Sequence, residues 1–97
     1  MKQIAEGIFL FDNDDAGYHN WIKDNPDGFV VNTYRKPNAR YLKTHRARCY
    51  TIKNLQPGYT SFTTDYRKYC SNELDKLKEW ALMEVQGKLQ FCLKCLK

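Results

Sequence analysis

The chain has 97 residues, a formal net charge of +5 and 42% hydrophobic residues, which suits one folded domain over residues 1–97 and excludes a second core. The longest uncharged apolar run, Gly7 to Phe11, is too short to span a bilayer. The N-terminus has no secretory pattern, so we expect a cytoplasmic protein without a membrane partner.

The charge is unevenly distributed along the chain. Residues 1–27 hold six acidic side chains against two lysines, whereas residues 28–64 hold no acidic side chain. A basic segment interleaved with tyrosines favours contact with nucleic acid, because cations neutralise phosphates and aromatic rings stack on bases. Such cations also commonly decorate a solvated face, and an acidic protein is the alternative partner. The candidate nucleic-acid-binding residues are Arg35, Lys36, Arg40, Lys43, Arg46, Arg48 and Lys53.

The first elements in chain order are a strand and a short helix. The apolar stretch Ile4 to Phe11 predicts a strand whose alternate side chains face opposite sides. Asp12 to Asp15 then provide carboxylates that suit the start of a helix, and the turn residues 25–28 end it. The apolar positions of this helix are Tyr18, Trp21 and Ile22.

The middle of the chain predicts an antiparallel pair of strands. Phe29 to Tyr34 is rich in β-branched and aromatic residues, and Arg40 to His45 alternates as its partner after a turn at Pro37. A short helical turn is expected near Cys49 to Ile52. Residues 59–70 have further strand-like character.

The C-terminal third predicts the longest helix. Ser71 suits its N-cap, and Gly87 suits its end. We expect its apolar face to pack against the strand 29–31 and against Trp21 and Ile22. The fold class is therefore α+β: a small antiparallel sheet with a short N-terminal helix and a longer C-terminal helix. The apolar stripe consists of Leu74, Leu77, Ala81 and Val85.

Two spaced pairs of soft ligands indicate a zinc site. His45 and Cys49 are separated by three residues, and Cys92 and Cys95 by two, so that each pair can reach one metal ion. Cys70 is a substitute ligand. The cysteines could instead pack as small hydrophobic side chains without a metal. A redox function is disfavoured, because the Cys92–Cys95 pair does not open a helix after a strand.

The segment 43–97 also resembles the Ada-type metal-binding domain. The resemblance lies in the order His45-x3-Cys49, a strand, a helix containing Ala81, and Cys92-x2-Cys95. It implies a structural zinc and contact with DNA, although Ada itself has cysteine at the position of His45 and the family usually has proline at the position of Phe91. The segments 12–18 and 25–32, together with His45-Arg46-Ala47, resemble an uncharacterised bacterial module, which implies no function.

No catalytic pattern is recognisable in the sequence. It contains no nucleophile elbow, phosphate loop or pair of carboxylates at catalytic spacing, so we expect no enzymatic activity. The sequence predicts a small zinc-stabilised accessory module that binds nucleic acid through its basic surface. The alternative is a metal-free protein-interaction domain.

Overall fold

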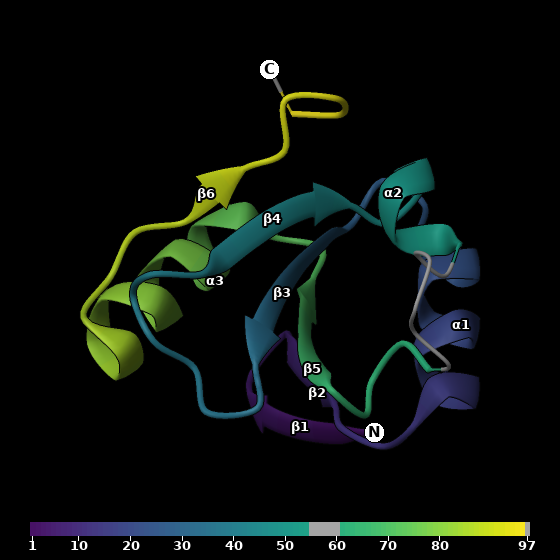
Figure 1. Cartoon of the computed structure of the whole chain (residues 1–97), viewed down its shortest axis with the longest axis horizontal. Helices are drawn as coiled ribbons and strands as arrows, with labels where there is room; N and C mark the ends of the chain where they lie inside the picture. Colours follow the sequence, from purple (N-terminus) through teal and green to yellow (C-terminus); the bar gives the residue numbers. More distant parts are fainter. Residues whose placement is uncertain (55–60, 97) are drawn as a thin grey trace.

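The computed structural model describes residues 1–54 and 61–96 and has the predicted α+β architecture (Figure 1). Six strands form one sheet in the order β1-β2-β5-β3-β4-β6. All neighbouring strands are antiparallel except β4 and β6, which are parallel. The strands are β1 (Lys2–Ala5), β2 (Ile8–Phe11), β3 (Phe29–Tyr34), β4 (Leu42–Arg46), β5 (Tyr66–Ser71) and β6 (Gln90–Phe91). The helices are α1 (Asp15–Asp24), α2 (Tyr50–Lys53), α3 (Leu74–Trp80) and the π-helical continuation η1 (Ala81–Val85).

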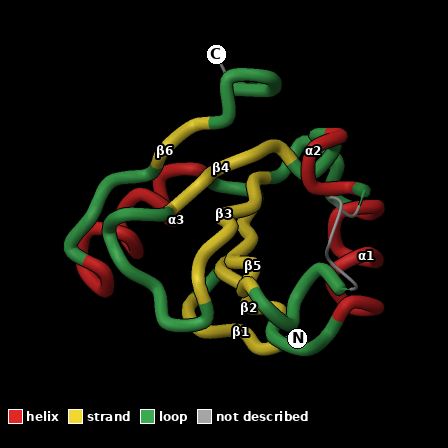
Figure 2. The backbone as a smooth tube through the Cα atoms, in the orientation of Figure 1, coloured by secondary structure: helices red, strands yellow, loops and turns green. Residues whose placement is uncertain are grey.

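The sheet separates two hydrophobic cores because successive side chains of a strand point to opposite faces. Val30 belongs to the core beneath α1 and α2, whereas Val31 belongs to the core beneath α3. Cys70 and Tyr69 of β5 are divided in the same way. Figure 2 shows the consequence, with α1 and α2 on one side of the sheet and α3 on the other.

Helix α1 begins as the acidic cluster predicts. The side chain of Asp14 caps it by accepting a hydrogen bond from the backbone N–H of Gly17. Asp15 has a second use, since its carboxylate accepts three hydrogen bonds, one from the backbone N–H of Phe62 and two from Thr63. Tyr18 and Ile22 are buried against the sheet. The first turn of α1 therefore also fixes the segment that leads into β5.

The helix formed by α3 and η1 buries Leu77 and Ala81 of the predicted stripe and leaves Leu74 and Val85 half-buried, and it packs against only one of the two predicted partners. Leu77 and Ala81 are fully buried, and they pack with Val31 on one face of the sheet. Trp21 and Ile22 lie with the core on the other face. The expected contact between the two helices is therefore wrong, because the sheet stands between them.

The end of the C-terminal helix also differs from the expectation. The left-handed residue is Gln86, with φ of 57°, rather than Gly87. Gly87 serves close packing instead, because a Cβ atom there would lie 2.8 Å from the Cβ atom of Ala39. Ser71 ends β5 rather than capping the helix directly, although its hydroxyl accepts a hydrogen bond from the N–H of Glu73.

The single strand predicted from Ile4 to Phe11 is wrong, because a turn at Glu6 and Gly7, where Gly7 has a φ of 79°, folds the segment into the antiparallel hairpin β1–β2. The other elements lie near their predicted positions. Strand β3 has the predicted bounds, β4 begins two residues later than expected, and α2 forms beside Cys49. The strand-like region 59–70 contains β5 except for its last residue, Ser71, while Tyr59 and Thr60 lie outside the described residues. Strand β6 has no counterpart in the sequence-based expectation. Within the described ranges, no helix combines the length and the apolar character needed to cross a membrane.

Candidate metal centre

The four predicted metal ligands lie together at one edge of the sheet. The ligand atoms of His45, Cys49, Cys92 and Cys95 are all within 4.8 Å of one another. His45 comes from the end of β4 and Cys49 from the start of α2, whereas both remaining cysteines follow β6. Two segments more than forty residues apart in the sequence thus contribute two ligands each.

The parallel pairing of β4 and β6 brings the two halves of this cluster together. Lys43 pairs with Gln90 and Thr44 pairs with Phe91. The backbone N–H of Cys92 then donates to the carbonyl of Thr44 at 2.9 Å, which places Cys92 beside the His45 end of β4. Main-chain hydrogen bonds therefore set the position of the second half-site.

The Cys92–Cys95 segment is a tight turn that directs both sulfurs to the same place. The N–H groups of Cys95 and Leu96 donate to the carbonyl of Cys92 at 3.4 and 2.8 Å. Burial acts to raise the pKa of the Cys92 thiol, but hydrogen bonds from the backbone N–H of Lys94, from the thiols of Cys95 and Cys49 and from the backbone N–H of Cys95 together outweigh it and lower that pKa. The turn consequently favours a thiolate at Cys92, the form that binds metal.

One further hydrogen bond connects the two halves of the cluster, and two others link His45 to Cys49 within the first half. The backbone N–H of Arg46 donates to Cys95 Sγ at 3.4 Å, across the gap between β4 and the C-terminal turn. The hydroxyl of Thr51 lies 3.0 Å from Cys49 Sγ and 3.1 Å from His45 Nδ1. Thr51 thus holds a thiol and an imidazole in a fixed relation, although no sequence pattern indicated it.

The geometry of the cluster fits a tetrahedral metal ion. Bonds of about 2.3 Å from zinc to sulfur place the ligand atoms of a tetrahedron about 3.7 Å apart. The observed upper limit of 4.8 Å is larger by only about an ångström. A small inward movement of the side chains would therefore complete the coordination shell.

The electrostatics of the cluster favour a bound cation. Burial lowers the pKa of His45 to about 4, with smaller contributions from Lys43 and Lys68, so its imidazole is neutral and able to donate a lone pair. Burial raises the pKa of Cys95 to about 12, and the adjacent Cys49 adds to this rise. Neighbouring thiolates repel one another in such a site, and a dication removes that repulsion.

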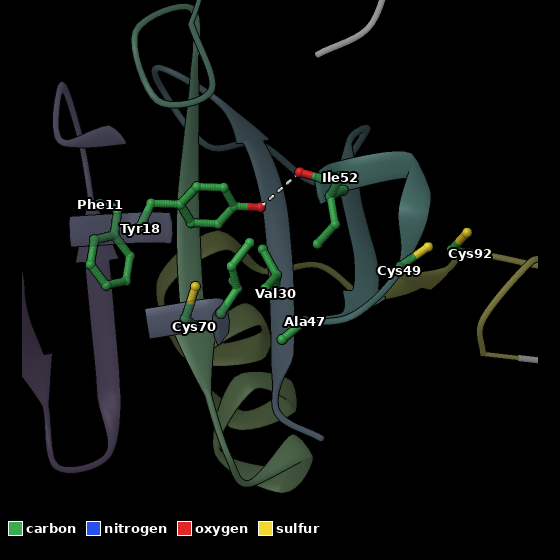
Figure 3. Packing of buried hydrophobic residues seen from close by; sticks show 9 residues of the cluster. Phe11, Tyr18, Val30, Ala47, Cys49, Ile52, Cys70 and Cys92 are labelled. Carbon is green, nitrogen blue, oxygen red and sulfur yellow. Dashed lines mark hydrogen bonds between the residues drawn. The ribbon is translucent and has the colours of Figure 1, made fainter. Parts of the chain in front are cut away.

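Cys70, the substitute ligand, lies outside this cluster. A row of paired residues crosses one face of the sheet in the order Phe9, Cys70, Val30 and His45. Since neighbouring strands are about 4.8 Å apart, Cys70 stands about 10 Å from His45 along this row. Figure 3 shows its sulfur beneath Tyr18, away from the sulfurs of Cys49 and Cys92. Cys70 is fully buried, and this burial raises the pKa of its thiol.

The seven basic residues form two groups rather than one continuous patch. Strand β3 has six residues, so the two ends of the β3–β4 pair are about 17 Å apart. The hairpin-end group lies at the turn of this pair and on β4, and the metal-end group lies beside the candidate metal centre. The hairpin-end group consists of Arg35, Lys36, Arg40 and Lys43, and the metal-end group of Arg46, Arg48 and Lys53.

Acidic residues of the N-terminal segment form ion pairs with two of these cations. Arg35 forms an ion pair with Asp12 at 2.8 Å, and Arg48 forms one with Asp27 at 2.7 Å. Arg46 donates to the carbonyl of Asp27 and lies over the ring of Phe29, on the face opposite to His45. Folding therefore offsets part of the charge asymmetry that the sequence shows. The sequence alone does not indicate these pairs.

The coordination chemistry of the cluster is that of a closed site. Four protein ligands leave a tetrahedral ion no open position for water or substrate, as is typical of structural zinc sites. In a 97-residue chain such an ion would tie the C-terminal turn to the sheet. Comparison of the chain with protein-family models, with curated proteins and with solved structures finds no match.

Proposed function

We propose that this chain is a small, non-catalytic module that is stabilised by a zinc ion and binds nucleic acid through its basic surface. The observation that carries the proposal is the convergence of one imidazole and three thiols within 4.8 Å. A thiol can be buried among any apolar side chains and needs no other thiol beside it. Metal binding therefore explains better than packing why four soft ligands from two distant segments lie together.

Zinc is the metal that suits this ligand set best. Thiolates and imidazole are borderline or soft donors, and zinc accepts a tetrahedral arrangement without any preference from its d electrons. Three of the four ligands are buried, and the fourth is half-buried. The resemblance of segment 43–97 to the Ada-type metal-binding domain also supports a structural zinc ion.

The proposed nucleic-acid surface centres on the hairpin-end group. Lys36 and Arg40 are exposed, and Lys43 is half-buried on the adjoining strand. The metal-end group is a weaker candidate, because Arg46 and Arg48 are both engaged with Asp27. Cations that a phosphate can approach without breaking an ion pair contribute more directly to binding.

Salt-dependent binding tests this proposal. We expect affinity for a short duplex DNA to fall with salt, and replacement of Lys36, Arg40 and Lys43 by Gln to reduce the slope by about 2–3, since each phosphate contact contributes about 0.9. The matched control replaces Lys2, Lys23 and Lys78, which are exposed on β1, α1 and α3, and should leave the slope unchanged. Absence of binding to duplex and to single-stranded DNA at low salt would refute the nucleic-acid part of the proposal.

A protein-interaction function is the second candidate, and one surface feature favours it. A groove of about 840 Å³ lies between the β1–β2 hairpin and the C-terminal helix, lined by residues that include Ile4, Trp80 and Met83. Met83 on η1 is an exposed apolar side chain of this groove. Capture of a protein partner that Met83→Ser abolishes, together with absent DNA binding, would favour this candidate.

A further inference from the structure

Three tyrosines gather at the hairpin end of the sheet. Tyr34 and Tyr41 are stacked with their ring centroids 5.1 Å apart and their planes inclined by 25°. Tyr66 lies 5.9 Å from each of them. We call Tyr34, Tyr41 and Tyr66 the tyrosine cluster. It draws on β3, on the residue before β4 and on β5, so three separate parts of the chain contribute to it.

The register of the sheet produces this cluster. Tyr34 pairs with Tyr66 across β3 and β5, and Tyr41 immediately precedes β4, the partner of β3 on the other side. In the next row on the same face, Asn32 pairs with Lys68 and with Lys43. A row of aromatic rings thus lies beside a row that carries an amide between two lysines.

Polar contacts hold the two rows in a fixed relation. The side-chain amide of Asn32 donates to the hydroxyl of Tyr41 at 3.0 Å and accepts from Lys68 Nζ at 2.5 Å. Lys68 Nζ also lies 5.8 Å from the ring centroid of Tyr66. Burial lowers the pKa of Lys68 to about 8, so this ammonium group remains largely charged at neutral pH. The rings are therefore oriented by a network rather than by apolar packing alone.

The tyrosine cluster is separate from both cores. Among the described residues, neither core includes any of its three members, and Tyr34 is 42% exposed. Its sequence neighbours are cationic, since Arg35 and Lys36 follow Tyr34, and Arg40 precedes Tyr41. Tyr41 and Tyr66 are half-buried, so Tyr34 is the exposed member of the row. An exposed aromatic ring bordered by cations is the arrangement by which proteins stack unpaired bases and hold the adjoining phosphates.

We propose that the tyrosine cluster is a base-stacking site that makes single-stranded nucleic acid the preferred ligand of this chain. This inference rests on the proposed nucleic-acid function and narrows it to strands with unpaired bases. A base stacks on the exposed ring of Tyr34, while Lys43 and the exposed side chains of Lys36 and Arg40 meet the phosphates. A duplex keeps its bases stacked internally and gains only the phosphate contacts.

Substitution of Tyr34 tests the inference with labelled oligothymidylate and a duplex of mixed sequence as probes. We expect Tyr34→Leu to weaken oligothymidylate binding by about 5- to 150-fold, the loss expected for one stacked base, without changing duplex affinity. Tyr34→Phe keeps the ring and should bind as the native chain does. Tyr50→Leu is the matched control, because Tyr50 is an exposed tyrosine on α2, outside the cluster.

The possible outcomes separate this inference from the function on which it rests. If oligothymidylate and duplex both bind and Tyr34→Leu has no effect, the stacking site is wrong while the nucleic-acid function stands. If neither probe binds at low salt, the nucleic-acid function itself fails. Poly-glutamate has charge but no bases and represents an acidic protein partner. If it displaced labelled oligothymidylate as effectively as unlabelled oligothymidylate does, the inference would also be overturned. Thermal melting of each variant verifies that it is folded.

Discussion

The hydroxyl of Thr51 links two of the candidate ligands, His45 and Cys49. It lies within hydrogen-bonding distance of the imidazole Nδ1 and of the sulfur, so it orients both side chains before a metal binds. Groups that orient metal ligands typically affect affinity by about 10- to 100-fold. The sequence predicted the ligands through their short spacings, but Thr51 has no signal beyond its nearness to Cys49.

Replacement of Thr51 should therefore weaken metal binding without abolishing the fold. We expect Thr51→Val to lower zinc affinity by about 10- to 100-fold, and Thr51→Ser, which retains the hydroxyl, to bind zinc nearly as the native chain does. Competition with a chromophoric chelator measures both affinities. Equal affinities for the Val and Ser variants would show that the hydroxyl does not position the ligands.

Asp15 should make part of the stability depend on pH. Burial acts to raise the pKa of this carboxyl, but hydrogen bonds from the side chain and backbone of Thr63 and the backbone of Phe62 outweigh it and lower the pKa below 3.8. A folded-state pKa below the unfolded value gives stability that is present above pH 3.8 and is lost as the pH falls through the folded value.

Comparison with Asp15→Asn isolates this contribution. We expect the variant to be less stable by about 1–2 kcal/mol at neutral pH, near the lower range for hydrogen bonds to a charged group because the carboxylate is partly exposed. The difference should shrink on acidification. Urea unfolding followed by the fluorescence of Trp21 and Trp80 measures it, and a difference that stays constant with pH would contradict the assignment.

At the scale of elements, the buried face of a strand or helix was easier to predict from the sequence than the element against which that face packs. The apolar stripe predicted the buried face correctly at Leu77 of α3 and at Ala81 of η1. The expected packing of α3 against α1 was wrong. Val30 and Val31 lie on opposite faces of the sheet, so β3 packs against helices on both of its sides. Strand β6 could not be predicted, since two residues carry no periodicity and its pairing depends on β4.

Leu77 provides the test of how α3 is packed. Leu77→Ala should cost about 2–5 kcal/mol of unfolding free energy, because the side chain is fully buried and its removal leaves a cavity. Leu82→Ala is the matched control on η1, where the leucine is 64% exposed, and should change stability by less than about 0.5 kcal/mol. Denaturant midpoints of the two variants provide the comparison. Similar losses for both would mean that the helix does not pack in this orientation.

At the scale of the whole molecule, the metal centre would connect the last residues of the chain to its middle. Without an ion, the C-terminal turn is held by the short strand β6 and by a few hydrogen bonds, including that from Arg46 to Cys95. The predicted basic surface differs most from the sequence-based expectation. The length of the β3–β4 pair separates its cations into two groups, and Asp12 and Asp27 form ion pairs with two of its arginines. Charge pairing across the sheet depends on the topology, which the sequence did not reveal.

Metal content of the protein, purified without chelator, tests the central claim most directly. We expect one zinc ion per chain, retained in Cys70→Ala and lost in Cys95→Ser, since Cys95 belongs to the cluster and Cys70 does not. Chelation should lower the melting temperature sharply, because structural zinc contributes about 10–16 kcal/mol in small zinc-dependent domains. A native chain that is metal-free, folded and unaffected by chelator would contradict the account.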